Sequence, residues 1–367
     1  MKRFLITALT LLFSTYLFAA APTAAELATE SLNSYREALN SFDNMDYGKA
    51  LKYSEDAILF RKQQVEKEKQ TLKDSLSVKR VRDAGDSIYA VLDVLEDRKE
   101  KESIRIINTY LKKKGVDYFD NSITKLREYM NSMIHYPEAH KLIGDIYRLE
   151  GEYKFAEDYY LLALNNVDVL DVPDEKYEIL YMLAEISRLE NDLPKMEVRL
   201  LNILADDSSY KDRALNQAML HTIRTNKSDS MEKLFTLYRA ESFYSMEAYS
   251  KLADYYYSQG LSEKALQFTA LSVICGFSKI SEVIESRNSN YEYTNLVNFF
   301  QEFMFYPDIV EWGSKKMLWK NFNFLAKLAY EEGDVNFARS LLVVLAQWSP
   351  EKYWQKEAVL LLGEIKN

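Results

Sequence analysis

The stretch PEAHKLIGDIYRLEGEYKFAEDYYLLALNN, residues 137–166, decides the fold class of this chain. Small and aromatic residues alternate along it at helical spacing: Gly144, Tyr147, Ala156, Tyr160 and Ala163. Two helices can cross closely where small residues meet, and large rings fill the space beside the crossing. Gly151 stands between the two runs and can adopt the positive φ that ends a helix. The pattern predicts an antiparallel helix pair whose apolar face is completed by stacking on neighbouring pairs.

The same pattern recurs along the chain with a period of about 34 residues. Clear copies begin at Pro137, Met246 and Trp319, and weaker copies begin near Ser31, Ser103, Tyr177 and Asp212. Turns between the two helices of a copy are expected at Asp43–Asp46, Asn191-Asp192, Asn226–Asp229, Gly260 and Gly333. The weaker copies keep the register of the clear ones, which favours one continuous array.

This pattern resembles the tetratricopeptide repeat superfamily. The pair Ile143-Gly144 matches the Leu-Gly of the family, and His140 stands where the family has tryptophan. Pro350 stands where the family's terminal proline stops the second helix. The resemblance implies an all-α fold, a right-handed superhelical solenoid of antiparallel helix pairs, and it implies a protein that binds other proteins.

The repeats divide the chain into two regions after the leader. Residues 26–135 form an N-terminal helical region with a degenerate repeat and a long helix, and residues 136–367 form the repeat array with a C-terminal capping helix. Two stretches depart from the pattern, 60–82 and 278–313. The second stretch carries an aromatic cluster: Phe299, Phe300, Phe303, Phe305 and Tyr306. Such a cluster can be a docking patch or part of the core, and burial is favoured.

The first 25 residues have the organisation of a secretory signal peptide. Lys2 and Arg3 precede an apolar run at 4–18, and small residues follow it. Cleavage fits after Ala21 or after Ala25. The alternative is an uncleaved anchor, for which the apolar run is short against ~30 Å of hydrocarbon. We therefore expect a periplasmic protein without a lipid anchor and without membrane insertion after cleavage.

The composition narrows the possible functions. The formal net charge is -9, which disfavours non-specific binding of nucleic acid because such binding needs a basic surface. The chain has 10 Gly and 6 Pro, too few for the many turns of a β-sandwich or barrel.

Motifs for catalysis, cofactors and metals are missing from the sequence. His135 and His140 are not spaced to share a helix face, and no Cys or carboxylate cluster completes a zinc site. The single cysteine, Cys275, excludes an intramolecular disulfide; it is a reactive thiol or a small buried residue, and burial is favoured. We expect no catalytic residues, no cofactor and no metal.

The resemblance also places a partner surface on the concave face, which the first helix of each repeat lines. The positions that face it are Lys141, Asp145, Arg148, Tyr181, Glu185, Arg188, Asn216, Arg224, Asp254, Tyr257, Lys327 and Tyr330. Further positions of the same set are Glu138, Glu178, Arg213, Glu247, Ser250, Lys320 and Asn323. Mixed charge, long side chains and tyrosine suit a protein or peptide of the cell envelope better than an apolar small molecule. The two departing stretches are the alternative place for a partner, and a homo-oligomer is also open.

The first hypothesis is therefore a non-enzymatic scaffold for protein–protein interaction in the periplasm. By type and compartment, the chain also resembles the repeat proteins of the collar around periplasmic flagellar motors, and accessories of solute-binding transporters. An enzyme acting on the envelope is the remaining alternative, and only the expected compartment supports it.

Overall fold

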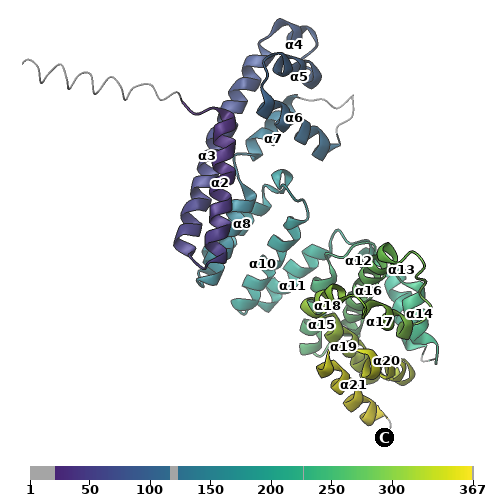
Figure 1. Cartoon of the computed structure of the whole chain (residues 1–367). Coiled ribbons are helices and arrows are strands. Elements are labelled where there is room, and N and C mark those ends of the chain that lie inside the picture. Colours follow the sequence, from purple (N-terminus) through teal and green to yellow (C-terminus); the bar gives the residue numbers. More distant parts are fainter. Residues whose placement is uncertain (1–20, 116–122, 226, 366–367) are drawn as a thin grey trace, which may run out of the picture. The chain divides into compact units, whose positions relative to one another are not determined.

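The computed structural model describes residues 21–115, 123–225 and 227–365 of the chain. Helices and short connections make up these ranges, and no strand occurs in them (Figure 1). The prediction of an all-α fold is therefore confirmed. Most of the expected signal peptide, residues 1–20, lies outside the described residues, as does Asn226 of one expected turn. The chain divides into two compact units, residues 1–179 and 180–367, so the division falls later than residue 135.

One type of helix pair recurs in both units. Five pairs of this type are α2 (Ala24–Asp43) with α3 (Tyr47–Leu76), α8 (Pro137–Leu149) with α9 (Tyr153–Leu164), α10 (Glu175–Leu189) with α11 (Leu193–Leu204), α15 (Met246–Ser258) with α16 (Ser262–Arg287), and α19 (Leu318–Glu331) with α20 (Val335–Trp348). Three residues connect the helices of each pair, and the middle residue has a positive φ: Met45, Gly151, Asn191, Gly260 and Gly333. The backbone N–H of the third residue donates to a carbonyl of the first helix at 2.8–2.9 Å. The same helix-ending geometry thus closes each of these five pairs, including the weak copy at Tyr177, whose turn is at Asn191.

The pair α8/α9 explains why its sequence alternates small and aromatic residues. A Cβ atom on Gly144 would lie 2.8 Å from ring carbons of Tyr160, so only glycine lets the two helices cross at this distance. Ala156 and Ala163 on α9 are fully buried. Tyr160 is also fully buried, and its hydroxyl donates to Asp145 at 2.6 Å.

In the first unit, the pairs α2/α3 and α8/α9 pack directly on each other. Helix α2 begins at a capping box, in which the Glu26 N–H donates to Thr23 Oγ1 at 3.2 Å and the Thr23 N–H donates to the Glu26 carboxylate at 2.7 Å. Ala57 of α3 packs against Tyr136 and Ala139 at the start of α8. This contact leaves no space for another repeat between the two pairs.

The segment between α3 and α8 forms a side structure on the far half of α3. It contains α4 (Lys79–Asp83), α5 (Ile88–Asp97), α6 (Lys101–Lys114) and α7 (Ile123–Ser132). Its core takes in Val65 and Leu72 of α3, and also Val169 of the short 3₁₀ helix η1 (Val167–Val169). The expected long helix is present as α3, but it ends at Leu76 instead of continuing through the stretch 60–82. The expected copy at Ser103 does not stack between the pairs α2/α3 and α8/α9. Helix α3 already packs on the face of α8 against which this copy would have to stack.

In the second unit, α11 packs on α15, α16 packs on α19, and the last helix α21 (Lys352–Ile365) packs on α19 and α20. A buried polar chain links these layers: Ser250 donates to Asn321 at 3.0 Å, Asn321 donates to Ser272 at 3.0 Å, and Ser272 donates to the Met246 carbonyl at 3.0 Å. Because one amide satisfies both hydroxyls, α15, α16 and α19 are held in one register.

The copy expected at Asp212 is likewise not a layer of the stack. Its residues form α12 (Ser208–Lys211), α13 (Arg213–Arg224) and α14 (Ser230–Leu237). Tyr181 of α10 bonds directly to the start of α15, so the pairs on either side of this segment are already neighbours. Phe235 of α14 instead packs against Phe277 of α16 and Phe322 of α19. The prediction that the weak copies at Ser103 and Asp212 continue the array was therefore wrong.

The aromatic stretch after α16 is mostly core. It forms α17 (Leu296–Phe303) and α18 (Pro307–Lys315), and Phe299, Phe300 and Phe303 are fully buried around Trp319. Phe305 is different, since 78% of its surface is exposed in the turn between the two helices. Burial of the cluster is confirmed for its first three rings. None of the described helices is long and apolar enough to span a lipid bilayer.

Candidate binding groove on helices α10, α15 and α19

A groove of about 410 Å³ runs beside α10 and α15 in the second unit. Its apolar surface comes from Ala184, Leu193, Met196, Tyr255 and Met317, and its charged surface comes from Glu185, Arg188, Glu247, Lys251, Asp254, Lys315 and Lys316. Met317 ends the connection between α18 and α19 with a φ of 55°, and 56% of its surface is exposed. An apolar strip between charged walls suits an amphipathic segment of another protein.

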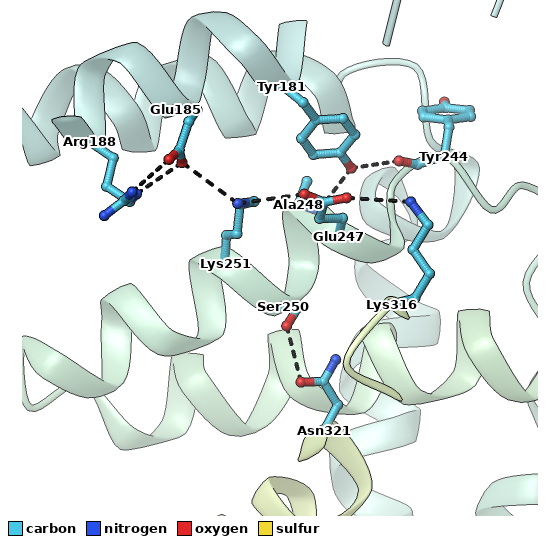
Figure 2. A network of polar contacts seen from close by, with 10 residues as sticks. All are labelled: Tyr181, Glu185, Arg188, Tyr244, Glu247, Ala248, Ser250, Lys251, Lys316 and Asn321. Carbon is cyan, nitrogen blue, oxygen red and sulfur yellow. Dashed lines mark hydrogen bonds and ion pairs between the residues drawn. The ribbon is translucent and has the colours of Figure 1, made fainter. Parts of the chain in front are cut away.

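Five charges alternate in sign along this groove (Figure 2). Arg188 contacts Glu185 through two hydrogen bonds of 2.9 and 2.6 Å. Lys251 lies 3.9 Å from Glu185 and 3.5 Å from Glu247, and Lys316 lies 3.6 Å from Glu247. The row begins and ends with a cation. Its lysine contacts are long and partly exposed, and such ion pairs contribute at most about 1 kcal/mol each. An incoming carboxylate can therefore replace them at little cost.

The Tyr181 hydroxyl holds the end of the groove together. It donates to the Tyr244 carbonyl at 2.6 Å and accepts from the Ala248 N–H at 2.9 Å (Figure 2). Ala248 lies in the first turn of α15, whose N–H groups have no partner within the helix. Burial, with the carboxylate of Glu247 nearby, raises the pKa of Tyr181. Tyr181 is therefore an anchor between α10 and α15, and not the free contact residue that was predicted.

Replacing Tyr181 by phenylalanine should lower the free energy of unfolding of the second unit by about 2 kcal/mol, because a buried carbonyl and a buried N–H both lose their partner. All 4 tryptophans lie in this unit, so tryptophan fluorescence during urea unfolding measures the effect. The matched control is Tyr257→Phe, whose more exposed hydroxyl donates to Glu331 at 3.0 Å. This control should stay within about 0.5 kcal/mol of the wild type. Equal losses in the two variants would contradict the anchoring role.

The charged surface continues from α15 onto α19. Lys320 pairs with Asp254 at 2.6 Å, and Lys327 lies 3.8 Å from Glu331 and 5.0 Å from the centre of the Tyr257 ring. The hydrogen bond with Tyr257 helps to raise the pKa of Lys327 above its ordinary value. Lys320 and Lys327 also line a second groove of about 390 Å³, whose other wall is formed by Trp354, Leu360 and Leu361 of α21.

The structure brings nine of the predicted residues onto this surface: Glu185, Arg188, Glu247, Ser250, Asp254, Tyr257, Lys320, Asn323 and Lys327. Tyr330 follows on α19 and is half-buried. Arg213 is exposed on α13, apart from this surface. Arg224 lies elsewhere, where it pairs with Glu263 at 3.1 Å and approaches Glu332 at 3.9 Å. Asn216 is buried on α13 away from the groove. These corrections follow from the displacement of α12–α14 out of the stack.

The remaining predicted residues belong to the first unit. Lys141 lies 3.4 Å from Asp145 and 3.3 Å from Glu178. Burial alone would lower the pKa of Lys141, but these two carboxylates raise it above its ordinary value. Arg148 is half-buried on the next turn of α8. Glu138 is a correction, since its carboxylate is buried and accepts from the Asp171 N–H at 2.6 Å.

Several residues of the groove were not predicted, and the most prominent among them are Lys251, Lys316 and Met317. Lys251 stands four residues after Glu247, a spacing that puts both on one helix face and could have indicated it. Lys316 and Met317 come from a connection whose place beside α15 depends on how α18 and α19 pack, and no local pattern reports this.

Catalytic or metal-binding arrangements are not evident in the described parts of the chain. Within residues 21–115, 123–225 and 227–365, no group of three or more His, Cys, Asp and Glu residues is placed to hold a metal ion. Cys275 is buried, and burial raises the pKa of its thiol, so its environment is that of a core residue.

Comparison with known proteins adds one relative. No protein-family model matches the chain. The chain is similar to an uncharacterized protein of Treponema pallidum (strain Nichols), with 28% identity over 328 residues that cover 88% of this chain and 87% of that protein. The aligned length exceeds that of either compact unit, so the similarity extends into both. The description of that protein names no activity or partner, and the geometry of the groove therefore carries the functional argument.

Proposed function

We propose that this protein is a non-enzymatic scaffold of the tetratricopeptide type, exported to the periplasm, which binds a partner protein through the surface of α10, α15 and α19. The five helix pairs support the repeat type, because all of them end their first helix with the same left-handed residue and backbone hydrogen bond. The small residues at their crossings support it further, as at Gly144 and Ala156.

The observation that carries the binding proposal is the five-charge row beside an apolar strip. The bound segment lays an apolar face against Met196 and Met317, while its acidic side chains contact Lys251 and Lys316. The outermost charges of the row are cations, although the whole chain has a net charge of -9. A partner segment that is acidic at its ends matches this arrangement by charge complementarity.

Charge reversal tests the binding proposal. The variant Lys251→Glu with Lys316→Glu should weaken partner binding by about 30-fold or more, because two attractive contacts become repulsive. The matched control is Lys233→Glu with Lys279→Glu, which changes the net charge equally at partly exposed lysines of α14 and α16. A photocrosslinking amino acid at position 317 should attach the partner in native envelopes, and the partner recovered there is then used for the affinity measurement.

Three results would refute the binding proposal: no discrete crosslinked protein from position 317, equal crosslinking in the charge-reversed variant, or equal weakening by the control variant. Export is tested separately. Alkaline phosphatase fused after residue 40 should be active, since this enzyme folds only where disulfides form. Inactivity of a stably expressed fusion would contradict the periplasmic assignment.

A further inference from the structure

Another concave site lies on α12 and α13 of the second unit, apart from the two grooves described above. It has a volume of about 520 Å³, within the range of roughly 300–1,000 Å³ that is usual for small-ligand sites. Its lining combines residues of α12 and α13 with one residue of α16: Tyr210, Lys211, Arg213, Asn216, Gln217, Leu220 and Gln267. None of these residues lines the first groove.

The charge of this pocket is positive. Lys211 and Arg213 are exposed at its rim, no carboxylate is part of its lining, and neither cation forms an ion pair with any residue that the structure describes. Asp212 stands between them in sequence, but its side chain accepts from the Leu215 N–H at 2.9 Å as the cap of α13. Two uncompensated cations in a chain of net charge -9 favour an anionic ligand.

Asn216 supplies a buried acceptor without a partner. Only 5% of its surface is exposed, and its amide nitrogen donates to the Ser209 carbonyl at 3.0 Å and to the Tyr210 carbonyl at 3.3 Å. Because both partners are carbonyls, the nitrogen must face them, and this settles the orientation of the amide. The remaining oxygen, Oδ1, is buried and accepts no hydrogen bond in the structure. Since Oδ1 is enclosed, Asn216 holds α13 against α12 beneath the pocket, and contact with a ligand is made by the more exposed side chains of the lining.

The rest of the lining is also made for hydrogen bonds. Gln217 and Gln267 each offer both a donor and an acceptor, and Tyr210, which packs on Phe268 with ring centres 6.2 Å apart, adds a hydroxyl. Groups that both donate and accept match the hydroxyls of a sugar, which do the same. A peptide would also need apolar subsites for its side chains, and Leu220 is the only aliphatic residue of the lining.

We propose that this pocket binds an anionic saccharide, with Lys211 and Arg213 on its carboxylate or phosphate and Gln217 and Gln267 on its hydroxyls. Because salt screens exposed charge pairs, the affinity for the saccharide should fall as the ionic strength rises. The proposal is independent of the protein-binding groove, and its variants leave that groove intact.

The test uses the full mature chain on an array of acidic saccharides (uronic acid oligomers and phosphorylated sugars), each next to its neutral methyl ester or unphosphorylated counterpart. We expect retention of at least one acidic member and not of its neutral counterpart. Calorimetry with that member should then show at least tenfold weaker binding for Lys211→Ala with Arg213→Ala, and also for Gln217→Ala with Gln267→Ala, as expected for lost charged and polar contacts. The charge-matched control is Lys73→Ala with Lys112→Ala in the first unit, which should bind as the wild type does.

The proposal is overturned if no acidic saccharide is retained, if neutral counterparts bind equally well, or if both the cation and the glutamine variants bind with unchanged affinity. Binding of a hexaglutamate peptide as tight as that of the best saccharide would also overturn it, in favour of a peptide site. Circular dichroism spectra identical to that of the wild type confirm that the exposed substitutions leave the fold intact.

Discussion

Replacing Gly313 by alanine is expected to lower the free energy of unfolding of the second unit by about 2–3 kcal/mol. Gly313 lies on α18, and a Cβ atom there would lie 2.3 and 2.7 Å from two ring carbons of Trp319. The ring cannot yield easily, because it stacks on Phe303 at 5.0 Å and its N–H donates to Ser314 at 3.1 Å. Urea unfolding followed by tryptophan fluorescence measures the loss.

Two controls isolate the cause of this loss. Gly363→Ala on α21 should stabilise the unit by about 0.5–1 kcal/mol, because a Cβ atom there meets nothing within 4 Å and alanine favours the helix. In a Trp319→Phe background, the smaller ring leaves space for the added methyl group. The loss of unfolding free energy caused by Gly313→Ala should therefore be smaller than in the wild type by about 1 kcal/mol or more, which is a typical coupling energy between residues in contact. A Gly313→Ala protein as stable as the wild type would show that α18 and α19 do not cross this closely.

The stability of the first unit should fall by about 3 kcal/mol between pH 6.5 and pH 4 because of one residue, His140. Only 6% of its surface is exposed, its Nδ1 is buried without a hydrogen-bond partner, and burial, aided by His135, lowers its pKa to about 4. The folded state therefore binds fewer protons than the unfolded state below pH 6.5. Stability is complete above pH 6.5 and is lost as the pH falls through the folded pKa.

The measurement is the difference between two pH profiles of urea unfolding, one for the wild type and one for His140→Phe. Far-ultraviolet circular dichroism reports both units and tryptophan fluorescence reports only the second, so their comparison assigns the effect to the first. His140→Gln should give the same difference profile, since both substitutions remove the titrating group. If the difference in free energy of unfolding between the wild type and His140→Phe does not change with pH, the imidazole is hydrated in the folded state and the prediction is wrong.

The helix pairs were predictable from the sequence because their determinants are local. Gly144 and Ala156 mark where two helices cross, and Gly260 and Gly333 mark where one helix turns into the next. Even the weak copy at Tyr177 was predicted with its turn at Asn191, which indeed has a positive φ of 59°. Each of these features depends on residues within one pair, so periodicity and turn chemistry are enough to find them.

The order of the layers was not predictable in the same way. The starts at Tyr177, Asp212 and Met246 share one register, yet the Asp212 segment lies outside the stack. Its second helix, α14, ends after 8 residues, and its buried ring, Phe235, fits between the rings of Phe277 and Phe322. Regular spacing shows that a helix pair can form, but the competition between apolar faces decides which pairs become neighbours.

The same distinction applies to the two proposed sites. Glu185, Arg188 and Asp254 were predicted on the partner surface because their positions within a repeat are local properties. Lys316 and Met317 joined them only through the packing of α18 and α19, and the pocket around Asn216 exists only because α12–α14 left the stack. By itself, the sequence determined the helices, their pairing and their turns, which arise from contacts over short chain distances. The tertiary structure alone decided which pairs stack and where charges meet, because burial of apolar surface between distant segments is a property of the whole unit.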